Sequence, residues 1–275
     1  MRDMALALDD AASTPTLPPP LKWAGGKRWL VPHLLQYWRG NEQRRLVEPF
    51  VGGLAVTLGL SPRKALLNDL NPHLVNFYRW LQRGLDLREA GIELKNDRGV
   101  YAANRERFNE LIAAGNAESA EAAGLFYYLN RAGYNGLCRF NARGFFNVPF
   151  GRYKRIPYRE NFAPYGEALN AYEFTYGDFE RMRMRKSDFI YADPPYDVEF
   201  TSYSAGGFGW CDQQRLAEWL AQHPGPVVAS NQATKRVLKL YRSLGFATRV
   251  VPAPRRISCD GNRDDAEEMI AVRNL

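Results

Sequence analysis

The sequence predicts a doubly wound α/β sheet that is interrupted by a helical, basic insert. Short apolar segments alternate with helical segments near both ends of the chain, which is the pattern of such a sheet. Residues 85–132 read as largely helical with no strand among them, and the stretch that follows is rich in cations. We therefore expect a sheet domain built from residues 21–83 and 160–275, with an inserted helical subdomain over residues 84–159.

The elements before the insert form a compact unit. A helix starting near Gly26 is expected from the apolar spacing between Trp29 and Trp38. Residues 46–50 read as a strand that leads into Gly52 and Gly53, and a helix over 54–60 follows. A second strand over 64–68 ends in Asp69, and residues 72–83 read as a helix.

The alternation of strands and helices resumes after the insert. Strands are expected at 172–176, 188–192, 226–230, 247–251 and 268–272, and helices at 212–221 and 235–244. The strand over 188–192 leads into Asp193-Pro194-Pro195-Tyr196. Open α/β sheets carry their chemistry at this end of their strands.

Composition limits the classes of function. Residues 1–20 are rich in proline and lack the order of a secretory signal, so we expect a disordered leader and a cytoplasmic protein. No apolar stretch approaches the roughly 20 residues of a bilayer span. The three cysteines and three histidines are scattered, so the sequence predicts no metal site.

The net charge of +7 favours an anionic partner, and the positive charge is concentrated in the insert. Aromatic residues and glycines are interleaved with these cations, which favours a nucleic-acid surface over a merely solvated face. No acid lies among the cations of this stretch, which are Arg131, Arg139, Arg143, Arg152, Lys154, Arg155 and Arg159.

Single motifs leave alternatives open. The tetrapeptide at 193–196 suits the holding of a planar amino group, but taken alone it also fits an ordinary Pro-Pro turn. Gly52-Gly53 fits either a tight turn or the close approach of a nucleotide. Asp69 fits either a ribose contact or a helix cap. The loop from Lys22 to Lys27 lacks the spacing of a P-loop.

Taken together and in order, the motifs resemble those of Dam-like DNA adenine-N6 methyltransferases of the alpha type. The resemblance runs from Leu21 to the end of the chain. It is carried by residues 21–27 (LKWAGGK), 48–53 (EPFVGG), 68–71 (NDLN), 130–141 (NRAGYNGLCRFN), 146–154 (FNVPFGRYK) and 193–196 (DPPY).

The resemblance implies S-adenosyl-L-methionine as the cofactor and a Rossmann-like methyltransferase sheet. Cofactor-binding positions would be Trp23, Ala24, Gly25, Lys27, Phe50, Gly52, Gly53, Asp69, Asp178, Phe179 and Asp193. Asp178 fits a helix cap equally well. Asp193 and the Pro194 carbonyl would accept the two N–H groups of a flipped adenine, with Pro195 completing the motif and Tyr196 stacking on the base. No metal and no covalent enzyme intermediate would be needed.

The insert would recognise double-stranded DNA, and the resemblance implies the sequence GATC. Arg139 would read a guanine, Leu137 and Pro149 a thymine methyl group, and Lys22 another guanine. Tyr134 or Asn135 would fill the gap left by the flipped base, with ordinary packing as the alternative for Tyr134. Arg152 and Lys154 would bind phosphates, and Asn141 belongs to the same recognition motif. The partner of such an enzyme is either a restriction nuclease or none.

Three other functions remain open from the residues. A cytosine-N4 methyltransferase would use a similar motif, although Asp193 and the recognition run favour adenine. A protein glutamine methyltransferase would more typically carry Asn at position 193. A catalytically silent DNA-binding module is disfavoured by the intact motifs. Arg255-Arg256-Ile257-Ser258 resembles a basic segment of the family, but Asp260, Asp264 and Asp265 follow it and weaken a phosphate-binding role.

Overall fold

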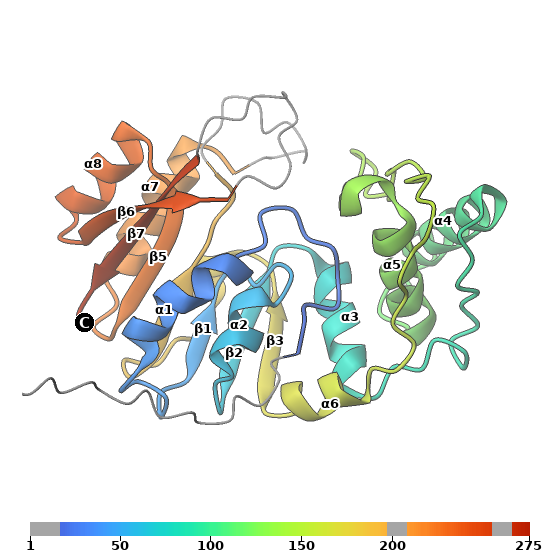
Figure 1. The fold of residues 1–275 in the computed structure, drawn as a ribbon, viewed down its shortest axis with the longest axis horizontal. Helices are drawn as coiled ribbons and strands as arrows, with labels where there is room; N and C mark the ends of the chain where they lie inside the picture. Colours follow the sequence, from blue (N-terminus) through green and yellow to red (C-terminus); the bar gives the residue numbers. More distant parts are fainter. Residues whose placement is uncertain (1–16, 197–207, 255–265) are drawn as a thin grey trace, which may run out of the picture.

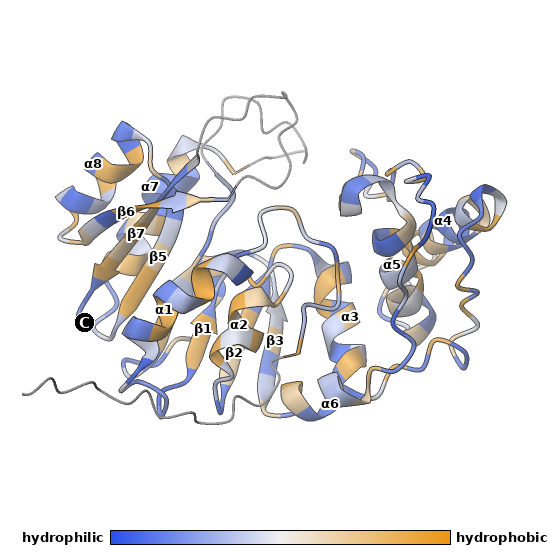
Figure 2. Ribbon diagram, in the orientation of Figure 1, coloured by the Kyte–Doolittle hydropathy of each residue, from blue (hydrophilic) through white to orange (hydrophobic). Residues whose placement is uncertain are grey.

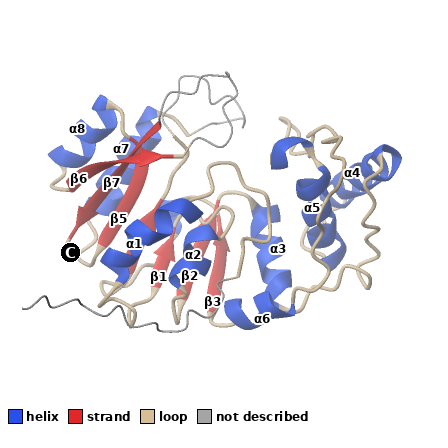
Figure 3. Cartoon of the chain, in the orientation of Figure 1, coloured by secondary structure: helices blue, strands red, loops and turns tan. Residues whose placement is uncertain are grey.

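The structure is a computed structural model that describes residues 17–196, 208–254 and 266–275. Within these ranges one seven-stranded sheet has the order β3-β2-β1-β4-β5-β7-β6 (Figures 1 and 3). The strands are β1 (Leu46–Glu48), β2 (Ala65–Asp69), β3 (Tyr172–Tyr176), β4 (Phe189–Ala192), β5 (Val227–Gln232), β6 (Ala247–Ala253) and β7 (Ala266–Arg273). All neighbours are parallel except β7, which is antiparallel to both β5 and β6. The predicted doubly wound sheet is confirmed.

Helices cover both faces of the sheet, and the strand residues alternate between two cores. On β4, Phe189 and Tyr191 pack with α1 (Val31–Trp38) and α2 (Ala55–Leu60), as the rings of Trp38 and Phe189 at 5.1 Å illustrate. Ile190 and Ala192 pack instead with α7 (Trp210–Ala221) and α8 (Lys235–Ser243). A sheet covered on both faces explains why its strands read as continuous apolar runs. Figure 2 shows these apolar residues concentrated on the strands and on the inner faces of the helices.

The insert leaves the sheet domain after α3 (Pro72–Gln82) and contains α4 (Arg98–Ala113) and α5 (Ala120–Ala132). It lies beyond α3, on the side away from the sheet (Figure 1). The helical prediction for residues 85–132 is right for α4 and α5 and wrong for residues 85–97, where turns replace the helix. Gly84 and Gly91 take φ values of +82° and +73° there, a conformation that ends helical turns.

The insert shares its core with the sheet domain. Phe77 of α3 stacks on Tyr127 of α5 at 5.9 Å, and Tyr127 in turn packs edge-on against Phe162 at 5.1 Å. Buried residues of α3, α5 and the sheet belong to one cluster. Such packing restricts movement of α5 relative to α3.

Two details differ from the sequence prediction. A short helix, α6 (Ala163–Leu169), precedes β3 and was not predicted. Residues 1–16 of the expected leader lie outside the described residues, whereas Leu17 packs on the core and the Pro18 carbonyl accepts a hydrogen bond from Tyr165 at 2.6 Å. Residues 17–20 are therefore packed rather than disordered. Among the described helices, none combines the length and apolar character that a membrane span requires.

Candidate active site

The order of the strands reverses between β1 and β4, and this reversal places the motif loops together. Gly52 and Gly53 follow β1, Asp69 ends β2, and Asp193 follows β4. The carboxyl ends of these parallel strands lie at one edge of the sheet. Ligands of open α/β sheets bind in the crevice at such a reversal.

One oxygen of the Asp193 carboxylate is fixed, and the other accepts no hydrogen bond from the described residues. Oδ1 lies 2.9 Å from Lys27 Nζ and accepts a hydrogen bond from Ser230 Oγ at 2.9 Å. Within the described part of the chain, no group donates a hydrogen bond to Oδ2. Burial raises the pKa of Asp193, and the neighbouring Lys27 charge opposes that rise. The side chain keeps 19% of its exposure.

Lys27 and Tyr196 share a partner that the sequence did not indicate, Glu268. Lys27 Nζ lies 3.4 Å from Glu268 Oε1 and donates to the Tyr196 hydroxyl at 2.9 Å. The Tyr196 hydroxyl donates in turn to Glu268 Oε2. Burial lowers the pKa of Lys27, but Asp193 and Glu268 more than reverse this effect and raise it overall. Lys27, Asp193, Tyr196 and Glu268 form one hydrogen-bonded cluster, which we call the lysine cluster.

The two prolines place the backbone of the motif. Pro194 is buried and Pro195 is exposed. The Pro195 carbonyl accepts a hydrogen bond from Gln213 Nε2 at 2.8 Å, and Asn231 holds Gln213 at 2.9 Å. These bonds attach the motif to α7 and β5, so its position depends on the sheet rather than on the loop alone.

Trp23 lies directly against the glycine loop after β1. A Cβ atom on Gly52 would lie 2.8 Å from Trp23 Nε1, and one on Gly53 would lie 2.8 Å from Trp23 Cβ. Gly52 also has a φ of +47°, so this position favours glycine for both reasons. Ala24 and Gly25 are exposed at the turn that follows Trp23. The predicted cofactor residues of the two loops are thus adjacent.

Asp69 binds backbone amides of two motif loops. Its Oδ2 accepts from Gly52 N at 3.1 Å, and its Oδ1 accepts from Asn71 N at 3.0 Å. The residue that caps α3 is Asn71, whose side chain accepts from His73 N at 3.0 Å. The alternative interpretation of Asp69 as a cap of α3 is therefore wrong. Burial raises the pKa of Asp69, although the backbone hydrogen bonds oppose the rise.

Aromatic rings gather beside this edge of the sheet. Phe50 lies 5.8 Å from Phe179 and 5.5 Å from Phe208, measured between ring centroids. Asp178 caps the short 3-10 helix η3 (Phe179–Arg181) by accepting from Glu180 N at 2.9 Å, and its other oxygen accepts from Arg215 at 2.8 Å. The capping interpretation of Asp178 is thus confirmed, while its contact with a cofactor stays a prediction.

Apart from Lys22, the predicted DNA-reading residues lie on the insert, away from the lysine cluster in sequence. Tyr134 begins the 3-10 turn η2 (Tyr134–Gly136) and keeps 50% of its exposure. Its amide donates to the Pro149 carbonyl at 2.9 Å. The neighbouring Asn135 is exposed and has a φ of +52°. Leu137 is half-buried against the core.

Residues 139–147 form a hairpin, and two side chains predicted to contact DNA make hydrogen bonds within it. Arg139 donates to the Asn147 side chain at 2.8 Å and to the Asn147 carbonyl at 3.0 Å. The Asn141 carboxamide oxygen accepts from Arg143 N at 2.9 Å and from Phe145 N at 3.1 Å, which shapes the turn. These bonds account for Asn141 without any DNA contact. The two bonds of Arg139 use its Nε donor and one Nη2 donor, so both donors on Nη1 and the second on Nη2 remain for a base.

Arg152 and Lys154 are exposed, whereas Lys22 is held by the protein. No ion pair joins Arg152 or Lys154 to an acid of the described residues. Lys22 Nζ donates to the Arg131 carbonyl at 3.2 Å and lies 3.7 Å from the centre of the Tyr153 ring. Burial and the Arg131 charge lower the pKa of Lys22.

Asn130 connects the insert to the loop of Lys22 and Trp23. The sequence indicated it only as part of a motif. Its carboxamide accepts from Lys22 N at 2.9 Å and donates to the Lys22 carbonyl at 2.8 Å. It also donates to the Gly136 carbonyl at 3.3 Å. The sequence carried one signal for it, because this asparagine directly follows the apolar run over residues 125–129. In the structure Asn130 is 1% exposed.

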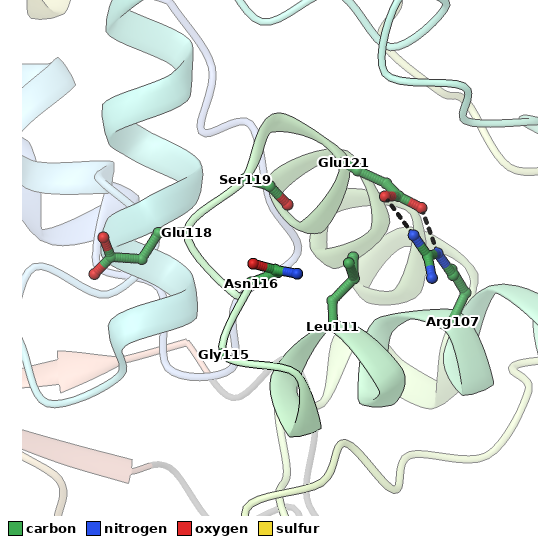
Figure 4. Close-up of a pocket in the computed structure, with 7 residues that line it drawn as sticks. All are labelled: Arg107, Leu111, Gly115, Asn116, Glu118, Ser119 and Glu121. Carbon is green, nitrogen blue, oxygen red and sulfur yellow. Dashed lines mark hydrogen bonds and ion pairs between the residues drawn. The ribbon is translucent and has the colours of Figure 1, made fainter.

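A hollow on the insert lies apart from these loops. It is found where α4 ends and α5 begins, and Figure 4 shows Arg107 paired with Glu121 at its rim. None of its lining residues belongs to the loops after β1, β2 or β4. Within the described residues, no group of three or more histidine, cysteine, aspartate or glutamate side chains is placed to hold a metal ion. The basic segment predicted at 255–258, with the acids that follow it up to Asp265, lies outside the described residues.

Comparison with known proteins agrees with the motifs. A family model described as "D12 class N6 adenine-specific DNA methyltransferase" matches residues 23–256. The chain is 38% identical to the DNA adenine methylase of Vibrio cholerae, over 92% of this chain and 94% of that protein. It is 37% identical to the DNA adenine methylase of Salmonella typhi, with the same coverage of 92% and 94%. It is 36% identical to the type II methyltransferase M1.LlaDCHI of Lactococcus lactis subsp. cremoris, over 84% of this chain and 86% of that protein.

Proposed function

This chain belongs to the D12 class of N6 adenine-specific DNA methyltransferases, and on that premise we propose that it transfers the methyl group of S-adenosyl-L-methionine to a flipped adenine within GATC. The observation that carries the proposal is the Asp193 carboxylate after β4, whose Oδ1 is fixed by Lys27 and Ser230 while Oδ2 accepts no hydrogen bond from the described part of the chain. A preorganised acceptor at the carboxyl edge of the sheet is what an exocyclic amino group requires.

The residues of the two motif loops fit the proposed cofactor. Asp69 presents a carboxylate at the end of β2, where nucleotide-binding sheets bind ribose hydroxyls, and each of its oxygens retains a lone pair beyond its amide bond. Phe50, which is half-buried, would offer an aromatic surface for an adenine ring, whereas Phe179 is 3% exposed and would support Phe50 from within the core. S-adenosyl-L-methionine held by these residues would supply an electrophilic methyl group, with its sulfur as the leaving group.

Asp193 and Pro194 would prepare the amino nitrogen. An adenine amino group is a weak nucleophile because its lone pair is delocalised into the ring. Asp193 Oδ2 and the Pro194 carbonyl would accept its two N–H bonds and direct the lone pair toward the methyl carbon, so that positioning supplies most of the rate. Oδ2 would accept the proton that the nitrogen loses after forming the N–C bond. Tyr196, anchored through its hydroxyl, would stack on the flipped base.

Sequence specificity would come from the insert. We propose Arg139 for a guanine, Leu137 and Pro149 for a thymine methyl group, and Tyr134 with Asn135 for the gap in the duplex. Arg152 and Lys154 would neutralise phosphates. Lys22 would contact a second guanine only after leaving the Arg131 carbonyl. The likeness to a type II methyltransferase motivates the proposal that a restriction nuclease accompanies the enzyme.

One assay tests this function. The protein is incubated with cofactor labelled in its methyl group and with duplexes that contain GATC, GATC with its adenine replaced, or an unrelated sequence. We expect label on adenine N6 of the GATC duplex alone. Label on cytosine N4 would favour the cytosine alternative, label on adenine in other sequences would refute GATC, and no labelled adenine in any duplex would refute the proposal.

A further inference from the structure

Glu268 is a buried carboxylate at the edge of the sheet where Asp193 lies. Only 1% of it is exposed. Because β7 runs antiparallel to its neighbours, the start of β7 lies at the carboxyl edge of the parallel strands. Glu268 is the third residue of β7 and reaches the lysine cluster from there.

Glu268 acts on two members of the cluster. Its Oε2 accepts the hydroxyl of Tyr196, which fixes the outer end of that ring. Its Oε1 lies 3.4 Å from Lys27 Nζ and has no hydrogen-bond partner among the described residues. Lys27 Nζ in turn lies 2.9 Å from Asp193 Oδ1, so a single ammonium group stands between two carboxylates.

The charge state of Glu268 therefore changes what Lys27 does to Asp193. With Lys27 protonated and both carboxylates ionised, the three groups carry a net charge of −1. With Glu268 neutral, they carry no net charge, and Lys27 pairs with Asp193 alone. Ion pairing reduces the negative charge that a carboxylate presents to other donors, and the effect is strong at these distances in a poorly hydrated site.

We propose that Glu268 is a positioning residue for methyl transfer: it holds Tyr196 through its hydroxyl and, when ionised, shares Lys27 with Asp193, so that Asp193 Oδ2 presents more negative charge to the amino group. This role rests on the function proposed above. Glu268 does not touch the reacting atoms.

The pH range follows from the groups that surround Glu268. Burial raises its pKa to about 7, against the opposing charge of Lys27. The titratable groups that face it in the described part of the chain are Lys27 from the loop before α1, Asp193 and Tyr196 from the loop after β4, and Tyr191 of β4. The pKa values of Lys27 and both tyrosines are raised, so these groups keep their protons near neutral pH. Glu268 loses its proton as the pH rises through about 7, and the rate should rise with it.

The test compares Glu268→Gln with Glu267→Gln. Glu267 is exposed and adjacent on the same strand, so its substitution removes an equal charge outside the cluster. Single-turnover methylation of a GATC duplex at saturating cofactor is measured from about pH 6 to about pH 9. The wild-type protein and Glu267→Gln should both gain about tenfold in rate across neutral pH. Glu268→Gln should lose this rise and be about tenfold or more slower at the alkaline end.

Each outcome decides the proposal. A Glu268→Gln protein with the wild-type rate and profile would overturn it, and so would one that is slower at every pH but keeps the rise. Should Glu268→Gln fail to fold, Glu268→Asp, which preserves the charge, must keep a pH-dependent rise, and a flat profile would count against charge sharing. An inactive wild-type protein would refute the proposed function itself, whereas an active one with an unaltered Glu268→Gln profile refutes this inference alone.

Discussion

Replacing Asn130 with alanine should loosen the loop that carries Lys22 and Trp23. The substitution removes the two hydrogen bonds to the Lys22 backbone and the one to the Gly136 carbonyl. At about 0.5–1.5 kcal/mol net for each bond, the free energy of unfolding should fall by about 2 to 4 kcal/mol. Lys22 is partly exposed, so water can bond to some of the backbone groups that lose Asn130. The loss of stability should therefore be smaller than if all these groups were left buried without a partner.

The same change should weaken cofactor binding, because Trp23 lies against Gly52 and Gly53. Once Asn130 is removed, the loop has to be ordered at the moment of binding. Ordering a single residue costs about 1–2 kcal/mol, which corresponds to an affinity loss of about five- to thirtyfold. Urea unfolding measures the stability, and titration calorimetry with the cofactor measures the affinity.

Asn109→Ala provides a matched control. Asn109 makes the same kind of two-bond contact, to the backbone of Phe146 at 2.8 and 3.1 Å, but within the insert. It should cost about 1–3 kcal/mol of stability and leave cofactor affinity unchanged. Equal losses of affinity in the two variants, or none in Asn130→Ala, would refute the reasoning.

Three further changes test other parts of the molecule. Asp193→Ala should reduce methylation at least a hundredfold and leave DNA binding by fluorescence anisotropy largely intact; an equal loss of both would indicate a structural role. Arg139→Ala should reduce discrimination at one guanine by about 1–3 kcal/mol in competition assays, whereas Arg143→Ala on the same hairpin should weaken all sequences alike; a uniform loss for Arg139→Ala would make it a phosphate contact. Burial lowers the pKa of His73 from 6.5 to about 4, so its contribution to stability is complete above about 6.5 and is lost as the pH falls toward 4. His73→Phe should therefore lose less unfolding free energy than the wild-type protein between about pH 7 and about pH 5, and identical losses in urea titrations would contradict this.

The regular elements were predictable because their apolar spacing is local. β4 and α7 lie within a few residues of the predicted ranges, since both bury apolar positions that a window of the sequence reveals. Residues 85–97 misled the same reasoning. Their composition suits a helix, but Gly84 and Gly91 have positive φ and limit the segment to a single turn, in which Ala90 N donates to the Asp86 carbonyl at 3.0 Å.

The lysine cluster was predictable only in part. Asp193, Tyr196 and Lys27 stand in recognisable motifs, whereas Glu268 is one of several acids near the end of the sequence and no local pattern distinguishes it. Its importance depends on the antiparallel placement of β7 between β5 and β6, which is a long-range property of the sheet. Met269, Ile270 and Ala271 are all buried, so the period-2 alternation that could have assigned a face to Glu268 is missing.

The position of β7 also sets when the enzyme can first become active during its synthesis. β7 is the last described strand of the chain, yet it lies between β5 and β6 and, among the described strands, it alone pairs with β6. A chain growing from the ribosome can therefore pair β1 to β5 before β7 emerges, but it cannot attach β6 or place the second carboxylate, that of Glu268, beside Lys27. Translation must reach the last strand before the sheet and the lysine cluster are complete, so a nascent chain still lacking β7 should not methylate DNA at the rate of the finished protein.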